Sequence, residues 1–508
     1  MIEFTTARSG APIVRYSGRS LVSTVDPLRE AQRFVIQAPP EGSVVIVIGA
    51  VCDYLARALK AIRTDTRALS IHLHPSTAAP ALTDPDAWWP GHRQPLFDFL
   101  SARISESDAL RVSVIEWKPA CDAFACASTD ARETVVQFVR QNQASLVTVG
   151  ALGRVWLRNL VCNYPAIKPA RISREAAGRY AAAVVVASGP SLEQGIRSIR
   201  SVRGDVFVLA TGSAIECLLA NGITPDMAIV TDGSPFASEQ LRSIVDAAIP
   251  VAAPLTACRA IGDVSGVIPF IQDSFLEPDL LAFQHEAPIT LASHGTVTAS
   301  AIALLRMLDS WPILVAGLDC AWFAGRSHAR PHIAERYRDV ASTRLVPSAT
   351  AGYAATRDHT RVGSGWTQDR SLATYAQWFA RSATSRFAPL CIIEPSPALS
   401  TLDRCDSPPT IGPRTHLGIA VAPAECPSPA ARRLLLRSRL EALARETSDV
   451  LLHAPAASTP LPASVFDAGR RVAISELLRY ERDPSPTSRR ELGDAIVARL
   501  DALRGCTR

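Results

Sequence analysis

The sequence has little lysine and methionine, and its cysteines are not paired. Only three of the 508 residues are lysine and three are methionine, so the basic residues are almost all arginine. We attribute the arginine, with the abundant alanine, to genome base composition rather than to phosphate binding. The formal net charge of +5 is small for this length. A nucleic-acid partner is therefore not expected.

The eleven cysteines are scattered singly, without CxxC spacing. An odd number of cysteines without a framework indicates a reducing compartment. His72 and His74 alternate on a predicted strand, but no cysteine or carboxylate joins them nearby, and we interpret them as surface histidines. No metal site is therefore predicted.

Long apolar runs and the common nucleotide fingerprints are also missing. No stretch of about 18 apolar residues exists, and the N-terminus has no apolar signal region. We therefore expect no membrane span and a cytoplasmic location. Gly49 ends a strand at 44–48 without the further glycines of a GxGxxG motif, and there is no P-loop lysine.

What remains is the pattern of a soluble α/β protein with 47% hydrophobic and 20% charged residues. Short apolar runs alternate with helical segments in the first third, at 44–48, 71–74 and 112–117, before a helical stretch at 134–164. This pattern predicts a parallel sheet. We interpret the first third as a structural domain without a functioning ligand site.

The central part is organised around a β-branched run at 184–187 that ends in Ser188-Gly189-Pro190-Ser191 and enters a helix at Leu192. Gly189 allows close approach of a ligand, and Pro190 suits a first helical turn. Free N–H groups and hydroxyls at a helix start favour a phosphate. We therefore expect Gly189→Val to abolish nucleotide binding while the protein stays folded.

Further predicted strand ends carry small, hydroxyl or acidic residues. Because ligands bind beyond the carboxyl ends of parallel strands, these ends predict a nucleotide or nucleotide-sugar pocket. The residues predicted to bind the nucleotide are Ser188, Gly189, Pro190, Ser191, Leu192, Thr211, Gly212, Ser213 and Asp232, with Ser293, Gly295 and Thr296 at a second helix start.

Asp319 follows the predicted strand at 312–317, and His328 lies in the next loop, where it is a candidate general base or phosphate partner. The polar, arginine-rich segment 329–366 is interpreted as a mobile lid. Prolines at 395–429 indicate an irregular boundary, and 430–447, 464–480 and 488–503 have helical spacing.

These motifs resemble the motility-associated factor (Maf) flagellin glycosyltransferases, whose central domain is called MptE-like or DUF115. The resemblance covers roughly residues 10–400 and is strongest over 156–329. The matching residues are Trp156, Asn159, Asn163, Gly189-Pro190-Ser191-Leu192, Gly222-Ile223-Thr224-Pro225-Asp226, Asp232, Gly295-Thr296-Val297, Gly317-Leu318-Asp319 and His328-Ala329.

The order of motifs is also similar to bacterial sialyltransferases that use CMP-sialic acid. The resemblance implies inverting transfer of a nonulosonic acid, such as pseudaminic or legionaminic acid, from a CMP-sugar to Ser or Thr of flagellin. It adds His359 to Asp319 and His328 as candidate catalytic residues. It implies no tightly bound cofactor beyond the CMP-sugar donor substrate. Trp322, where the family has tyrosine, and Glu394 depart from the pattern.

The resemblance implies a Rossmann-like, sialyltransferase-like central parallel sheet, a smaller α/β domain before it and a helical region after it. The predicted domains are 1–165, 166–405 and 406–508. Two alternatives remain: an ATP-dependent pterin pyrophosphokinase, and a catalytically degenerate flagellin-binding assembly factor.

Overall fold

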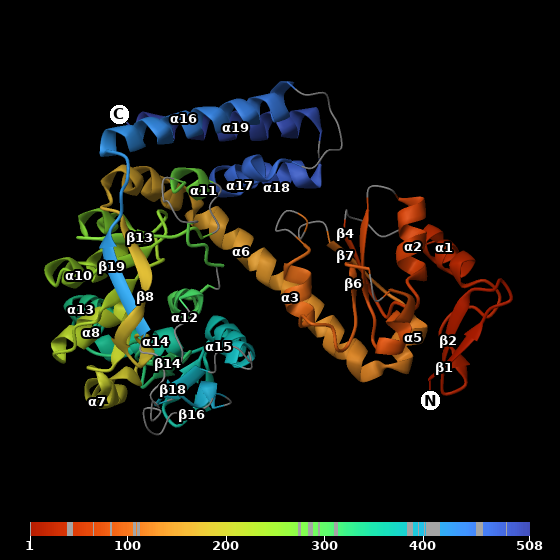
Figure 1. Cartoon of the computed structure of the whole chain (residues 1–508), viewed down its shortest axis with the longest axis horizontal. Helices are drawn as coiled ribbons and strands as arrows, with labels where there is room; N and C mark the ends of the chain where they lie inside the picture. The colour runs from red at the N-terminus through yellow and green to blue at the C-terminus, as the bar shows by residue number, and fades with distance from the viewer. Residues whose placement is uncertain are drawn as a thin grey trace. The chain divides into compact units, whose positions relative to one another are not determined.

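A computed structural model shows that the chain divides into two compact units, Met1–Ala151 with Leu477–Pro484 and Leu152–Glu476 with Ser485–Arg508 (Figure 1). The predicted boundaries at 165/166 and 405/406 stay a prediction. The described residues are 2–37, 44–63, 66–81, 84–104, 108, 112–272, 276–282, 288–292, 295–308, 313–383, 390–394, 396–400, 402, 417–453, 461–483 and 485–507.

The first unit holds a parallel sheet of four strands in the order β6-β5-β4-β7 and an antiparallel sheet β1-β2-β3. The central strand β4 is buried at every position, as its sequence Val-Val-Ile-Val-Ile predicts. The elements are β1 (Ile2–Thr6), β2 (Pro12–Tyr16), β3 (Arg19–Ser20), α1 (Pro27–Gln37), β4 (Val44–Ile48), α2 (Tyr54–Ile62), β5 (Arg67–Ile71), η1 (Pro75–Ala81), β6 (Ala87–Trp88), α3 (Leu96–Ser101), β7 (Val112–Glu116) and α5 (Lys118–Ala123).

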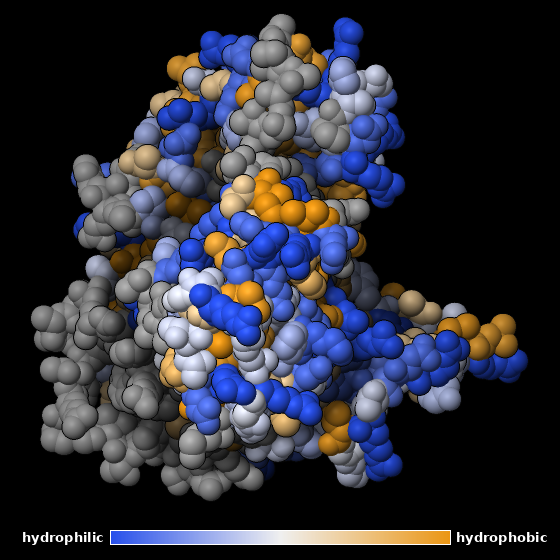
Figure 2. Space-filling model, turned by 90° about the vertical axis from the view of Figure 1, so that its right-hand side faces the viewer, coloured by the Kyte–Doolittle hydropathy of each residue, from blue (hydrophilic) through white to orange (hydrophobic). Residues whose placement is uncertain are grey.

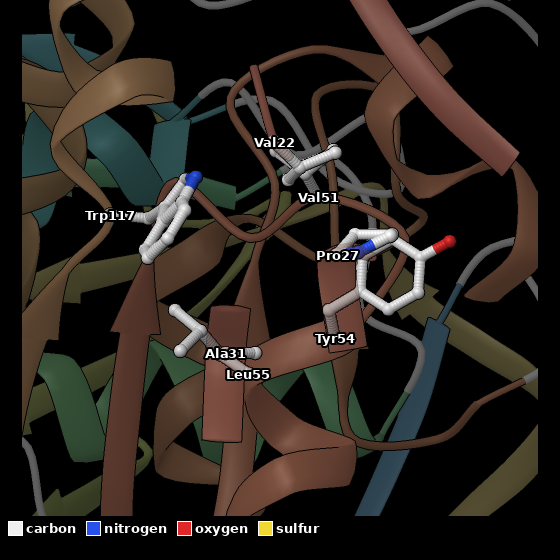
Figure 3. Close-up of a pocket in the computed structure, with 7 residues that line it drawn as sticks. All are labelled: Val22, Pro27, Ala31, Val51, Tyr54, Leu55 and Trp117. Carbon is white, nitrogen blue, oxygen red and sulfur yellow. The ribbon is translucent and has the colours of Figure 1, made fainter. Parts of the chain in front are cut away.

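Protein atoms fill the space at the carboxyl end of β4. Gly49 has φ +83°, and a Cβ there would lie 3.0 Å from Cys121 Sγ and 3.1 Å from the Trp117 carbonyl oxygen. The cavity of about 10 Å³ beside it has room for about one water molecule. Figure 3 shows its largely apolar lining of Val22, Pro27, Ala31, Val51, Tyr54, Leu55 and Trp117.

The interpretation of His72 as a surface histidine is wrong. Its side chain is 0% exposed, and its Nε2 lies 3.0 Å from Asp53 Oδ1. Asp53 and Cys52 both adopt left-handed backbone conformations in the turn after β4, and the Asp53–His72 pair ties that turn to the end of β5. His74 is half-buried, with its ring stacked on Phe124.

Helix α6 (Ala125–Ala166) includes the predicted helical stretch at 134–164 and continues from the first unit into the second. The second unit is built on a sheet of seven parallel strands in the order β13-β12-β11-β10-β9-β14-β18, which confirms the predicted fold class. Its strands are β9 (Ala182–Val186), β10 (Val206–Thr211), β11 (Met227–Ile229), β12 (Val251–Ala253), β13 (Val267–Pro269), β14 (Ile313–Ala316) and β18 (Leu390–Ile393).

Helices cover both faces of this sheet. Ala183 and Val185 of β9 share a core with Ala299 of α12 and Phe379 of α15. Since side chains alternate along a strand, Val184 and Val186 point to the opposite face, and they are also fully buried. The helices are α7 (Leu192–Val202), η2 (Gly212–Ala214), α8 (Ile215–Ala220), α9 (Pro235–Gln240), α10 (Arg242–Asp246), η3 (Arg259–Asp263), α11 (Glu277–Leu280), α12 (Val297–Met307) and α15 (Arg370–Ala383).

Two features differ from the sequence prediction. Part of the stretch expected to be irregular forms β19 (Leu417–Pro423), which pairs antiparallel with β8 (Ala170–Tyr180). The predicted lid contains regular structure within its described residues: α13 (Ile333–Val340), α14 (Ser348–Thr356) and β16 (Thr360–Gly363). Strand β16 pairs with β17 (Trp366–Gln368), and β17 pairs with β15 (Trp322–Phe323).

The C-terminal helices α16 (Pro429–Ser448), α17 (Ala463–Val472), α18 (Ile474–Arg482) and α19 (Pro486–Gly505) confirm the predicted helical pattern, with the middle segment divided into two. α16 and α19 run side by side (Figure 1). The short helical turns η4 (Pro397–Leu399) and η5 (Asp449–His453) follow β18 and α16.

Candidate functional site

The strand order places a topological switch point beside β9. Strands β10 to β13 extend from one side of β9, whereas β14 and β18 lie on the other. In open parallel sheets, the crevice beyond the carboxyl ends of such strands is the usual ligand site. The predicted turns after β9, β10, β11 and β14 therefore meet at one edge of the sheet.

Two backbone amides of the Ser188–Ser191 turn, those of Gly189 and Ser191, are already bonded within the protein. The Gly189 N–H donates to the Gly317 carbonyl at 2.8 Å, and the Ser191 N–H donates to Asp319 Oδ2 at 2.8 Å. The Leu192 N–H donates to the Gly189 carbonyl at 3.0 Å. The carboxylate of Asp319 thus takes the position at the start of α7 where the sequence predicts a phosphate.

Gly189 serves the packing of two turns. A Cβ at this position would lie 2.5 Å from the Gly317 carbonyl oxygen and against the Asp319 carboxylate. Gly317 itself has φ +67°. We therefore expect Gly189→Val to destabilise the fold as well, because the added side chain would collide with backbone and with a buried carboxylate.

Asp319 is 3% exposed, and within the described chain its Oδ1 has no hydrogen-bond partner. Burial raises the pKa of its carboxyl from 3.8 to about 6, against the lowering effect of the Ser191 hydrogen bonds. The Ser396 hydroxyl donates to the Asp319 carbonyl at 2.6 Å. Asp319 thus joins the turns after β9, β14 and β18, and its catalytic role stays a prediction.

We expect Asp319→Asn to change the pH dependence of stability. Since the pKa of Asp319 is raised in the folded state, that state keeps a proton that the unfolded chain releases between about pH 4 and pH 6. This group therefore lowers the free energy of unfolding as pH rises through that window. The interval from pKa 3.8 to about 6 corresponds to roughly 3 kcal/mol. Urea denaturation should show the variant gaining stability relative to wild type between pH 4 and pH 7, whereas parallel pH curves would contradict this assignment.

The hydroxyls after β9 and β10 form a connected group. The Ser213 hydroxyl donates to Ser188 Oγ at 2.8 Å, and its oxygen lies 3.3 Å from Thr211 Oγ1. Gly212 permits this turn, because a Cβ there would lie 2.9 Å from Val230 Cγ2. We call Ser188, Thr211 and Ser213 the hydroxyl cluster. Neutral hydroxyls donate and accept hydrogen bonds, as ribose and phosphate require.

The loop that carries His328 contacts the turn after β9, because the Ala329 N–H donates to the Ser188 carbonyl at 2.8 Å. Its ring stacks on that of His332, with centroids 3.9 Å apart and planes 3° apart. Burial lowers the pKa of His328 to about 4 and that of His332 to about 3. Both rings are therefore neutral at pH 7.

His332 also starts α13, where its Nδ1 accepts the Ala334 N–H at 3.2 Å. This bond makes Nε2 the protonated nitrogen of the neutral ring, and Nε2 is buried without a partner among the described residues. Sequence reasoning gave His332 no role. Its spacing of four residues from His328 would place the two rings together on a helix, but the segment between them is not helical. The spacing alone therefore did not predict the contact.

Asp232 and the loop after β12 are held by α6. Asp232 Oδ1 accepts the Ser234 N–H at 2.8 Å, in a turn that starts α9. A Cβ on Gly233 would lie 2.8 Å from Trp156 Nε1, so the indole packs directly on this turn. Asn163 Nδ2 donates to the carbonyls of Leu255 and Ala257, both at 2.9 Å. The Trp156, Asn159 and Asn163 motif thus shapes two loops at the candidate site.

The second predicted helix start forms as expected at Gly295 and Thr296. Gly295 has φ +74°, and Thr296 Oγ1 accepts the Ala299 N–H at 3.1 Å. Ser293 lies outside the described residues. The Tyr375 ring packs closely on Gly295, since a Cβ there would lie 3.0 Å from Cε1.

His359 belongs to a different group. Its Nε2 lies 3.9 Å from Asp369 Oδ2, its Nδ1 lies 3.4 Å from Thr367 Oγ1, and its ring meets Trp322 edge-on. The structure therefore brings the loop that carries His328 to the turn of Ser188, buries Asp319 under the α7 turn and places His359 among residues of the small β15-β17-β16 sheet.

Within the described ranges, no group of three or more His, Cys, Asp or Glu side chains is arranged to hold a metal ion. The same ranges contain no helix with the length and apolar character needed to cross a membrane. Figure 2 shows one face of the molecule, on which polar residues separate small hydrophobic areas.

Comparison with known proteins supports the predicted family resemblance of the central part of the chain. Residues 155–325 match the family model described as 6-hydroxymethylpterin diphosphokinase MptE-like. An uncharacterised protein of Treponema pallidum (strain Nichols) is 27% identical over 287 residues, which are 56% of this chain and 60% of that relative. The alignment thus spans less than two thirds of the relative's length.

A solved structure of the Maf glycosyltransferase from Magnetospirillum magneticum AMB-1 is 12% identical, with a TM-score of 0.45, and the match covers 100% of this chain and 91% of that one. The predicted family resemblance is confirmed where the family model matches. Residues 155–325, which hold α7 to α12 and the hydroxyl cluster, are therefore an MptE-like domain.

Proposed function

We propose that the second unit is a glycosyltransferase that binds a CMP-activated nonulosonic acid, of the pseudaminic or legionaminic type, and transfers the sugar to Ser or Thr of flagellin. The observation that carries the proposal is the hydroxyl cluster at the switch point of a parallel sheet, where the loop that carries His328 is bonded to Ser188. Such an edge suits a nucleotide substrate. The motif order that resembles CMP-dependent sialyltransferases supplies the sugar class.

The reaction would be an inverting displacement. The acceptor oxygen forms the new bond to the anomeric carbon, the bond from that carbon to the phosphate oxygen breaks, and CMP leaves with the electron pair. The hydroxyl proton passes to a base. His328 is neutral and can accept a proton, and an anionic phosphate bound beside it would raise its low pKa.

The test is transfer itself. The purified full chain is incubated with a CMP-nonulosonic acid and unmodified flagellin, and intact-mass spectrometry follows the acceptor. The proposal predicts mass increments of one or more sugar residues, together with release of CMP. Flagellin binding without donor turnover would contradict it and support the degenerate assembly factor.

We expect Ser213→Ala to weaken nucleotide binding by roughly fivefold to tenfold, because one hydrogen bond contributes about 1 kcal/mol. Ser213 links Ser188 and Thr211, so its loss also frees two hydroxyls from their common partner. The matched control is Ser201→Ala on α7, where the exposed hydroxyl bonds only the Ser198 carbonyl. Calorimetric titration with CMP should show weaker binding to Ser213→Ala than to Ser201→Ala. Equal affinities would show that the hydroxyl cluster does not bind the nucleotide.

A second candidate is favoured by the family description. The match to a 6-hydroxymethylpterin diphosphokinase MptE-like model supports pyrophosphoryl transfer from ATP to a pterin alcohol. The two reactions share a nucleotide site and differ in donor and acceptor. Conversion of ATP to AMP with a pterin alcohol, without sugar transfer from the CMP donor, would select the kinase.

A further inference from the structure

We propose that the α13–α14 hairpin is the docking surface for the polypeptide acceptor, and that it recognises a segment with apolar and acidic side chains. This inference rests on the proposed glycosyl transfer to a protein. Five large apolar or aromatic side chains are exposed within 17 residues of the chain. They are Tyr337 (51%), Val340 (85%), Leu345 (87%), Val346 (57%) and Tyr353 (72%). Clustered apolar exposure of this kind marks interaction sites.

The turn that carries Leu345 and Val346 is ordered by its own hydrogen bonds. The Thr343 N–H donates to the Val346 carbonyl, and the Val346 N–H donates to Thr343 Oγ1, both at 3.0 Å. The Ser348 N–H donates to Ser342 Oγ at 3.0 Å. A preformed turn presents its apolar side chains with little loss of conformational entropy on binding.

The hairpin is anchored on its inner side. Gly352 of α14 packs on the turn at Gly325, where a Cβ on Gly352 would lie 3.4 Å from the Gly325 carbonyl oxygen. Arg338 Nη1 lies 3.5 Å from the same carbonyl. The inner side of the hairpin is therefore packed against the turn at Gly325. The exposed apolar side chains are left for a partner on the outer side.

The exposed charge at the Leu345–Val346 turn is basic, whereas the exposed Asp339 precedes Val340 at the end of α13. Glu335 pairs with Arg330, and Arg336 pairs with Glu216. Arg344, which directly precedes Leu345, is exposed and forms no ion pair within the described chain. A basic side chain beside apolar ones favours an acceptor segment with acidic residues.

The surface is continuous with the candidate site. His332 starts α13 and stacks on His328, and the next residue, Ala329, is bonded to the Ser188 carbonyl. Phe236, which directly follows the Ser234-Pro235 start of α9, has its ring 6.4 Å from that of His332 and 6.1 Å from that of Tyr337. An acceptor held on the hairpin would therefore have its neighbouring residues close to the donor. This continuity favours a polypeptide substrate over a lipid surface, which would need no such connection.

The test uses the full chain with the double variant Leu345→Ser and Val346→Ser, and separately Arg344→Glu. Leu434→Ser on α16 is the matched control, since Leu434 is 71% exposed. We expect at least a tenfold rise in KM for flagellin in the double variant. CMP affinity and slow donor hydrolysis without acceptor should stay unchanged. Arg344→Glu should weaken flagellin binding most at low salt.

Unchanged KM and flagellin affinity in the double variant, or an equal loss in Leu434→Ser, would overturn the docking surface. Loss of binding to phosphatidylserine vesicles with flagellin binding intact would overturn it in favour of a membrane contact. Absence of sugar transfer from the CMP donor to flagellin in wild type would contradict the proposed function instead. In that case, direct binding of flagellin to wild type and variant still tests the surface.

Discussion

Gly189→Val should destabilise the second unit by about 3 kcal/mol, as expected for overpacking at a site with no room to relax. The β-carbon would lie 2.5 Å from the Gly317 carbonyl oxygen and against the Asp319 carboxylate. The turn after β9 must then move away from the turn after β14, which breaks the 2.8 Å bond from the Gly189 N–H to the Gly317 carbonyl. Urea denaturation followed by circular dichroism measures the loss.

The matched control is Gly204→Val. No heavy atom outside its chain neighbours lies within 4 Å of a Cβ at Gly204, so this variant should unfold close to wild type. A Gly189→Val protein that is as stable as wild type and has lost only its nucleotide affinity would contradict the packing role. It would restore the interpretation of Gly189 as a point of ligand approach.

Asn163→Ala should cost about 2 to 3 kcal/mol of stability. The side chain is 1% exposed, and its Nδ2 donates hydrogen bonds to the carbonyls of Leu255 and Ala257 in the loop after β12. Removing it leaves buried acceptors without a donor, which costs more than the net gain of an ordinary hydrogen bond. Hydrogen exchange should also speed up at residues 255–258, because the loop loses its attachment to α6.

Asn142→Ala on the same helix provides the control. Its half-buried side chain bonds only the Phe138 carbonyl one turn back, so its removal should have a much smaller effect. Equal destabilisation by the two variants would show that the attachment of the loop does not explain the loss, since helix propensity favours alanine over asparagine at both positions. Unchanged hydrogen exchange at 255–258 in Asn163→Ala would lead to the same conclusion.

The sequence was most informative where structure is local. The strand β9 and its turn were predictable, because a continuous β-branched run followed by Ser-Gly-Pro-Ser has few alternatives. The start of α12 at Thr296 followed from the same local logic. By contrast, β8 pairs with a strand some 240 residues later, and nothing in either segment alone identifies its partner.

The candidate site shows the same division. The residues Ser188, Thr211 and Ser213 were predicted from strand ends, and parallel pairing then brought them together. That Asp319 would fill the helix start beside Ser191 depends on a contact across 128 positions, which sequence patterns do not reveal. The stacking of His332 on His328 depends on the path of the loop between them.

The central claim is that the edge of the seven-stranded sheet binds a nucleotide. It is tested most directly by isothermal titration calorimetry of the purified full chain with CMP, UDP, GDP and ATP, each with and without magnesium. The account predicts binding that is selective for CMP and is weakened by Ser213→Ala. Selective binding of ATP would favour pyrophosphoryl transfer. No binding of any nucleotide to a well-folded sample would contradict the claim.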